Sequence, residues 1–147
     1  MRVSVKARYA LAATVYLSAK HGGGESLSAV SIAERLGISK IYLEQIFSTL
    51  RRAELITAIK GPQGGYKLAR SPEEITAYDI LFAADSALFE RAGDTVEEKA
   101  PALDAAIQTL VFDRLDEAVT TSLKSATLAE IAAEAQTNRT GQIMFYI

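Results

Sequence analysis

Cysteine is absent from all 147 residues, and its absence excludes several kinds of protein. Without a thiol the chain can form no disulfide, no thiolate zinc site and no cysteine-ligated iron–sulfur cluster, and it cannot sense redox state through a thiol. Histidine is nearly absent too, because His21 is the only imidazole and stands in a glycine-rich stretch. We therefore expect no cofactor and no metal site.

Long apolar runs are also missing. No run is long enough to span a bilayer, and the first residues, Met1 to Lys6, contain no apolar stretch of signal-peptide length. We therefore expect no contact with a membrane and a cytoplasmic location. At 49% hydrophobic and 23% charged residues, the composition is that of a globular protein, with enough chain for one core plus an arm.

The chain contains no recognisable catalytic constellation. No Ser/His, His/carboxylate or metal-ligand pattern occurs at a usable spacing. Glu73 and Glu74 are adjacent in sequence, as are Glu97 and Glu98, so the side chains of each pair point in different directions. The sequence therefore predicts that the protein is not an enzyme.

The formal net charge of −2 conceals an uneven distribution of charge. Residues 1–70 contain 11 Lys and Arg against 4 Asp and Glu, a net of +7, whereas residues 71–147 contain 5 against 14, a net of −9. A basic half joined to an acidic half suggests a module that binds a polyanion and a part held away from it. Charge alone leaves open that two solvated surfaces differ in sign by chance.

Three helices are predicted in the basic half from capping residues and helical spacing. Each follows a serine: Ser4 before residues 5–20, Ser28 before 29–36 and Ser39 before 40–53. Gly37 suits a left-handed cap, so a tight turn joins the second helix to the third. The apolar positions expected along them are Val5, Tyr9, Ala12 and Tyr16, then Val30, Ile32, Ala33 and Leu36, then an inward face of Leu43, Ile46, Phe47 and Leu50.

A β-hairpin is predicted next, with strands over residues 55–60 and 66–69. The turn between them begins Gly61-Pro62, where proline fixes one φ, and the pair Gly64-Gly65 is expected to supply positive φ. Small residues would let the backbone of this turn approach a DNA groove or phosphate closely. A nucleotide-binding loop is disfavoured because no helix begins directly after the turn.

The acidic half is predicted to contain a helix opened by Thr76 and Asp79, an unassigned charged stretch over residues 85–100, and a long helix from Pro101 to about Ser125. A capping box at Thr127 begins a last helix, over residues 128–135. The tail, residues 137–147, could be a strand, a docking peptide or a segment packed on a dimer, and packing is favoured. The predicted division is 1–85 for a DNA-binding domain and 86–147 for a dimerisation helix and C-terminal segment.

Three helices, a tight turn and a hairpin predict a mainly α protein with a winged helix-turn-helix domain. The third helix would lie in the major groove of double-stranded DNA, where Gln45 suits adenine, Glu44 the cytosine amino group, and Lys40 guanine or phosphate. A solvated helix face is the alternative. The residues predicted to contact DNA are Arg2, Lys6, Ser39, Lys40, Tyr42, Glu44, Gln45, Arg51 and Arg52, with Lys60, Gly61, Pro62, Gln63 and Gly64 of the hairpin.

The long helix has one apolar stripe. We predict that it joins two copies of the chain into a homodimer, although packing on its own domain is the alternative. The stripe consists of Leu103, Ile107, Leu110, Val111, Leu115, Val119 and Leu123. Nearby, Tyr78, Phe82, Phe89 and Phe112 could line a small effector pocket, though packing in a core is favoured.

Four segments together resemble the Rrf2 family of bacterial repressors: Ala7–Leu11, Ile38–Phe47, Leu50–Ile56 and Lys60–Ala69. The resemblance is dense up to about residue 85. It implies a winged-helix dimer, joined through the long helix, on a palindromic operator, with Tyr42, Glu44, Gln45 and residues 60–63 at the DNA. The family often has arginine where this chain has Lys60, which keeps the charge but loses bidentate hydrogen bonding.

The chain departs from many family members in the stretch of residues 88–102. Those members have three cysteines there, which bind an iron–sulfur cluster, and this chain has none. It therefore resembles the cluster-free branch of the family, typified by CymR, which is regulated through a partner enzyme, cysteine synthase. A small-molecule effector or a metabolic enzyme is a possible partner here. The alternative function is a protein-interaction module that has kept the fold and for which DNA binding is secondary.

Overall fold

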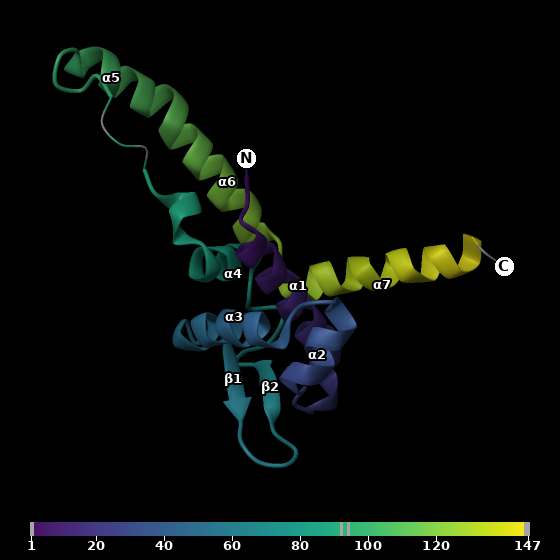
Figure 1. Ribbon diagram of the computed structural model, residues 1–147. Coiled ribbons are helices and arrows are strands. Elements are labelled where there is room, and N and C mark those ends of the chain that lie inside the picture. Colours follow the sequence, from purple (N-terminus) through teal and green to yellow (C-terminus); the bar gives the residue numbers. More distant parts are fainter. Residues whose placement is uncertain (1, 92, 94, 146–147) are drawn as a thin grey trace.

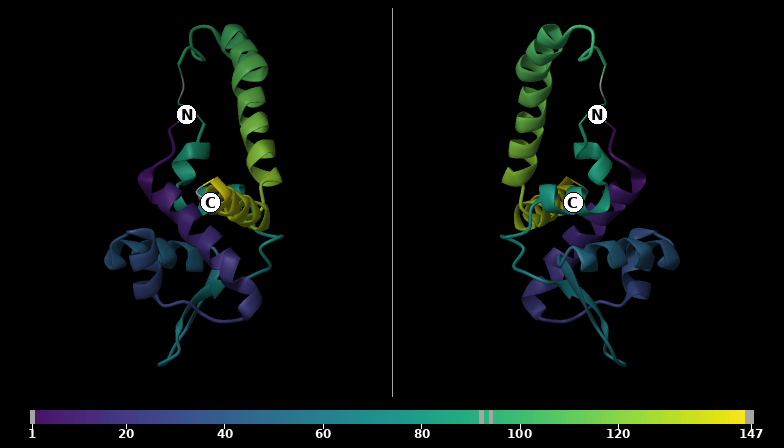
Figure 2. Two further views of the ribbon diagram at one scale, coloured as in Figure 1. Left: turned by 90° about the vertical axis from the view of Figure 1, so that its right-hand side faces the viewer. Right: turned by 90° about the vertical axis from the view of Figure 1, so that its left-hand side faces the viewer.

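The computed structural model describes residues 2–91, 93 and 95–145, and it confirms the mainly helical class with one small sheet. Two helical arms extend from a body of helices and a hairpin (Figure 1; two further views in Figure 2). No helix in these residues is long and apolar enough to cross a membrane. The elements of the body are α1 (Val5–Lys20), the 3-10 turn η1 (His21–Gly23), α2 (Ala29–Leu36), α3 (Lys40–Arg52), β1 (Ile56–Ile59), β2 (Gly65–Leu68) and α4 (Ala77–Ala84).

The arms are built from the second half of the chain. A 3-10 turn, η2 (Ser86–Phe89), leads out of α4, and one arm then consists of α5 (Pro101–Ile107), a π-helical segment η3 (Gln108–Phe112) and α6 (Asp113–Ser125). The other arm is α7 (Leu128–Phe145). In Figure 1 the α5–α6 arm and the α7 arm leave the body in different directions.

The predicted capping serines begin the first three helices. The hydroxyl oxygens of Ser4, Ser28 and Ser39 each accept a hydrogen bond of 3.1 Å from the backbone N–H three residues later. Each bond satisfies a donor that the first turn of a helix cannot pair internally. Gly37 ends α2 with a φ of 67°, so the tight turn into α3 is also as predicted.

The core forms around the inward face of α3. Leu43, Ile46, Phe47 and Leu50 are completely buried, as predicted, and they pack with residues of α1, α2 and α4. The prediction of the apolar face of α1 was partly wrong, because Val5 and Ala12 are exposed.

The buried face of α1 is lined instead by smaller side chains, among them Ala7, Ala10, Ala13 and Thr14. Small residues allow α4 and α7 to approach the helix closely. The Thr14 hydroxyl remains satisfied because it donates to the carbonyl of Ala10 at 2.8 Å.

The hairpin pairs β1 and β2 antiparallel, with Ile56 opposite Leu68 and Ile59 opposite Gly65. The predicted source of positive φ was wrong: Gly61 adopts φ 107°, whereas the pair Gly64-Gly65 does not have positive φ. Glycine is needed at these two positions because there is no room for a side chain. A Cβ on Gly64 would collide with the Ile59 carbonyl, and one on Gly65 would collide with the Leu27 carbonyl.

The helix α4 begins with the predicted capping box, in which the Thr76 hydroxyl accepts from the Asp79 N–H at 3.2 Å and the Asp79 carboxylate accepts from the Thr76 N–H at 3.0 Å. The stretch after it, unassigned from sequence, contains η2 and two polar contacts to the arm. Arg91 lies 3.4 Å from the Asp113 carboxylate, and the Thr95 hydroxyl donates to Asp104 at 3.3 Å. Glu97 and Glu98 are exposed, as expected for a solvated face, and Asp94 lies outside the described residues.

The predicted end of the last helix was wrong, because α7 continues far beyond residue 135 to Phe145. Polar residues and a glycine suggested a tail there. Inside the helix the threonine hydroxyls are satisfied, because they donate to the carbonyls four residues earlier, from Thr137 to Ala133 at 3.1 Å and from Thr140 to Gln136 at 3.0 Å. A terminal strand is therefore not formed over the described residues, and Tyr146 and Ile147 lie outside them.

The beginning of α7 belongs to the core of the body. Leu128 is completely buried, and its N–H donates to the Ile75 carbonyl at 2.9 Å. Residues on both sides of position 85 thus share one core, while the division of the chain into two domains at that position stays a prediction.

Candidate DNA-binding surface

The outward face of α3 is polar and accessible. Because Leu43, Ile46, Phe47 and Leu50 fix which side of the helix is buried, Lys40, Glu44, Gln45 and Ser48 are left on the surface. All four can hydrogen bond to base edges or phosphates. The structure thus brings together three of the α3 residues predicted to contact DNA, Lys40, Glu44 and Gln45, on the first turns of one helix.

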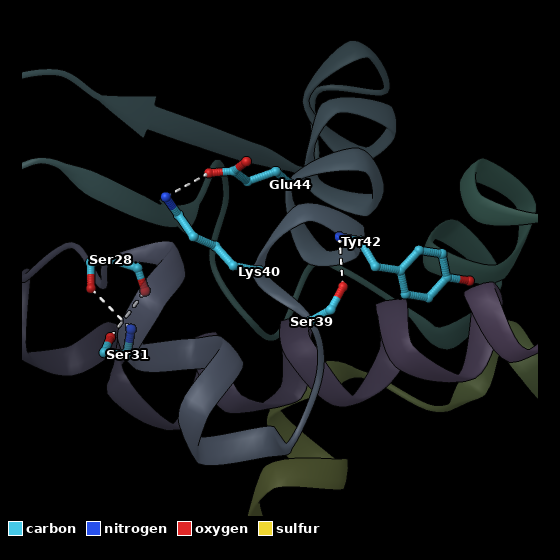
Figure 3. A network of polar contacts seen from close by, with 6 residues as sticks. All are labelled: Ser28, Ser31, Ser39, Lys40, Tyr42 and Glu44. Atoms are coloured by element: carbon cyan, nitrogen blue, oxygen red, sulfur yellow. Dashed lines mark hydrogen bonds and ion pairs between the residues drawn. The ribbon is translucent and has the colours of Figure 1, made fainter.

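Lys40 and Glu44 form an ion pair on this face. The Lys40 ammonium lies 3.6 Å from the Glu44 carboxylate, one helical turn away (Figure 3). Both side chains are about half exposed, so the pair is worth only a few tenths of a kcal/mol. Either residue can therefore exchange its partner for a nucleic-acid group at little cost.

Tyr42 points in another direction from the pair. Figure 3 shows its ring directed over α1, and the ring packs edge-on against Tyr9 with centroids 5.9 Å apart. Its side chain is half-buried, and its backbone N–H is used by the Ser39 cap. The structure therefore gives Tyr42 a contact that supports α3, which the sequence prediction of a DNA contact did not anticipate.

Lys6 also has a contact inside the protein. Its ammonium donates to the Thr49 hydroxyl at 3.2 Å and so links the first turn of α1 to α3. Lys6 is half-buried, in contrast to the exposed Arg51 and Arg52 at the end of α3. Arg2 is exposed in the segment that leads into α1. In Figure 1 this N-terminal segment lies at the opposite side of the body from the tip of the hairpin.

The tip of the hairpin is the second accessible polar feature. Lys60, Gly61, Pro62 and Gln63 are exposed, and the turn is closed by a 2.9 Å hydrogen bond from the Gly64 N–H to the Gly61 carbonyl. The Ser26 hydroxyl donates to the Gln63 carbonyl at 2.9 Å and holds the tip to the loop before α2. This tip, residues 60–64, is hereafter called the wing.

Packing contacts join the strand that carries the wing to α3. The ring of Phe47, on the buried side of α3, lies 4.6 Å from the ring of Tyr66 in β2. On its other edge β2 pairs with Leu27, whose N–H and carbonyl both bond to Tyr66, at 2.9 and 2.7 Å. The strand that supports the wing is thus held from both sides, so the wing keeps its position relative to α3.

Sequence reasoning missed one residue of this surface. Ile41 is 71% exposed on the first turn of α3, where an apolar side chain has no core to pack into. An apolar side chain at such a position suits contact with a thymine methyl group. The signal was present, because Ile41 falls outside the inward spacing of residues 43, 46, 47 and 50.

The apolar stripe of the long helix is on the surface. Leu103 is 58% exposed, Leu110 56% and Leu115 53%, while Val119 and Leu123, near the body, are half-buried. In an α-helix, side chains spaced four apart drift around the axis by about 40° at each step. The π-helical segment Gln108–Phe112 has more residues per turn than an α-helix, so it rotates the following side chains back toward the direction of the preceding ones. The outer part of the stripe therefore stays on one side of the arm.

Comparison with known proteins identifies relatives of this chain. Residues 3–134 match the Rrf2 family, described as an iron-dependent transcriptional regulator. The HTH-type transcriptional regulator CymR of Bacillus subtilis is 35% identical over the whole of both chains. The HTH-type transcriptional regulator IscR of Cereibacter sphaeroides is 46% identical over 86 residues, which are 58% of this chain and 56% of that protein.

Solved structures agree with this relationship. The structure of CymR (YrzC), the global cysteine regulator of B. subtilis, superposes with a TM-score of 0.76 at 34% identity and covers 91% of this chain and 98% of that one. The structure of T. potens IscR superposes with a TM-score of 0.70 at 33% identity and covers 92% and 88%. At these coverages both superpositions extend beyond the body into the helical arms.

The iron dependence in the family description does not fit the residues of this chain. There is no cysteine in the sequence, and the described residues contain no group of three or more His, Asp or Glu side chains placed to hold a metal ion. The stretch between η2 and α5, where the resemblance implies cluster ligands, is instead joined to the arm by the contacts of Arg91 and Thr95.

We expect Lys6→Met to act on stability more than on the electrostatics of DNA binding. Loss of the bond to Thr49 should lower the free energy of unfolding by about 0.5–1.5 kcal/mol, measured by urea denaturation. The slope of log affinity for DNA against log salt should change little, whereas Lys60→Met should reduce it by about 1, because the wing lysine faces solvent. Equal loss of slope in both variants, with no loss of stability in Lys6→Met, would show that Lys6 binds phosphate directly.

Proposed function

The chain belongs to the Rrf2 family of transcriptional regulators, and from this premise we propose that it is a homodimeric repressor that binds a palindromic operator through α3 and the wing. The observation on which this rests most is the outward face of α3, which is polar and accessible because the opposite face is completely buried. The basic charge of residues 1–70 supplies the sequence-independent attraction to DNA. A protein that acts on the bacterial chromosome works in the cytoplasm, which is where we place it.

The proposed contacts divide into two classes. Lys40, Ile41, Glu44 and Gln45 would meet base edges in the major groove, where hydrogen bonds and methyl contacts distinguish sequences. Phosphate contacts would hold the protein in register. They come from the Ser39 end of α3, from Arg51 and Arg52 at its other end, and from the wing residues Lys60, Gly61, Pro62, Gln63 and Gly64, with Arg2, Lys6 and Tyr42 at the margin or behind the surface.

The dimer is proposed from the exposed stripe on α5–α6. Exposure of large apolar side chains such as Leu103 and Leu110 to water costs free energy, and a second copy would remove that cost by covering them. Two copies related by a twofold axis present two identical recognition helices, so the two DNA half-sites would be inverted repeats.

Regulation without a thiolate-bound cluster leaves two kinds of signal, a small-molecule effector or a partner protein such as a metabolic enzyme. A chain that acted mainly through protein contacts, with weak DNA binding, is the second candidate function. The exposed stretch of α7 over residues 133–141 is the observation that favours it, because this surface is far from α3 and the wing.

Operator recognition is tested by selecting bound sequences from a random DNA pool and measuring affinity by fluorescence anisotropy across a salt series. We expect the selected sequences to share an inverted repeat. Gln45→Ala should weaken binding by about 1–3 kcal/mol per half-site and relax the preference at one base pair. Gln136→Ala, the same change on the exposed face of α7, is the matched control and should leave affinity unchanged. Weak, sequence-blind binding that Gln45→Ala does not alter would favour the protein-interaction function instead.

The dimer is tested by sedimentation of the double variant Ile107→Asp/Leu110→Asp. Two carboxylates in the stripe should give a folded monomer, because burying an unpaired charge costs more than the apolar contact gains. Ala105→Asp/Thr109→Asp introduces the same charges on the other side of the helix and should remain dimeric. An intact dimer in the first variant would rule out the stripe as the interface.

A further inference from the structure

A cavity of about 540 Å³ lies between the body and the arm. One wall is formed by the rings of Tyr78, Phe82 and Phe89, from α4 and η2, and the other by Leu115, Asp116 and Thr120 of α6. This volume is within the range of small-molecule sites in proteins.

The expectation that these aromatic residues pack as a core was wrong for Phe82 and Phe112, which are 49% and 42% exposed. Phe112 does not line the cavity and instead lines a smaller neighbouring hollow, to which Asp116 also contributes.

The aromatic wall is a single contiguous surface. The rings of Tyr78 and Phe82 stack with centroids 5.6 Å apart and planes 16° apart, and Phe89 packs on both, at 5.0 Å from Tyr78 and 5.7 Å from Phe82. The faces of such rings are negative and attract cations. One such contact is already present within the chain, where the ammonium of Lys124 lies 4.8 Å from the centre of the Tyr78 ring.

The opposite wall contributes a carboxylate. Asp116 is exposed at the cavity, and over the described part of the chain its carboxylate has no ion-pair partner, since the two ion pairs there are Lys40–Glu44 and Arg91–Asp113. Lys124 is two helical turns farther along α6, about 12 Å along the axis. The Asp116 end of the cavity is therefore negative and faces an apolar, ring-lined wall.

We propose that this cavity binds a small organic amine with a flat apolar body. The ammonium pairs with the Asp116 carboxylate, and the body lies against the rings of Phe82 and Phe89. Thr120 is available for a polar substituent. A neutral molecule of the same shape gains the apolar contact but not the ion pair, and an anion of that shape is repelled by Asp116.

The position of the cavity makes such a ligand a regulator, and this step rests on the proposed function. The helix α4 packs on α1 and α3, whereas α6 belongs to the arm through which the two copies are proposed to associate. A molecule held between α4 and α6 fixes the angle of the arm to the body. In a dimer that angle sets the separation of the two recognition helices, which must match the spacing of the half-sites.

The test is calorimetric titration of the full-length protein with three probes of one shape: phenethylamine, phenethyl alcohol and phenylacetate. We expect phenethylamine to bind about tenfold more tightly than the alcohol, and phenylacetate to show no binding. Asp116→Asn should reduce the affinity for phenethylamine to that for the alcohol. Glu117→Gln removes the same charge from the next residue of α6, outside the cavity, and should leave all three affinities unchanged.

Three outcomes would overturn the proposal: binding of phenethylamine that Asp116→Asn does not weaken, equal binding of the amine and the alcohol, or no binding of any probe. Because the titration contains no DNA, its result is independent of operator binding. Anisotropy with the selected operator, in the presence and absence of phenethylamine, then tests the regulatory step. An amine that binds at Asp116 without changing operator affinity would confirm the site and overturn only its regulatory consequence.

Discussion

The complete burial of one face of α3 is the constraint on which the rest of the structure depends. Leu43, Ile46, Phe47 and Leu50 have no solvent exposure, so the helix cannot rotate without exposing apolar surface at a cost of several kcal/mol. That fixed rotation decides which residues face outward. Through the contact of Phe47 with Tyr66, the same burial also positions the hairpin and the wing at its tip.

The two halves of the chain meet different physical demands. The basic half presents cations and a bare backbone turn to a polyanion, and its ion pair between Lys40 and Glu44 is weak enough to be exchanged for DNA contacts. The acidic half repels DNA and presents an apolar stripe whose exposure is costly in a lone chain. Its net charge of −9 agrees with the proposal that this half of the chain stays away from the DNA.

The sequence alone predicts those elements whose signals are local. Capping serines locate the beginnings of α1, α2 and α3, and helical spacing identifies all four buried residues of α3, because caps and periodicity depend on neighbouring residues. The length of α7 could not be predicted, since threonine is a weak helix former and the bonds from its hydroxyls to the preceding turn are not visible in the sequence. The contacts of Lys6 with Thr49 and of Tyr42 with Tyr9 join α1 to α3, and no local pattern reports such long-range pairs. The space required at Gly64 and Gly65 likewise arises from the Ile59 and Leu27 carbonyls packed against them.

The most direct test of the central claim is a crystal structure of the protein bound to its selected DNA. The account predicts two copies related by a twofold axis, with the first turns of α3 in successive major grooves. Glu44 and Gln45 should lie within hydrogen-bond distance of base edges, with the wing against the adjoining backbone. A complex in which α3 faces solvent, or in which DNA contacts only the arms, would contradict the assignment of this surface.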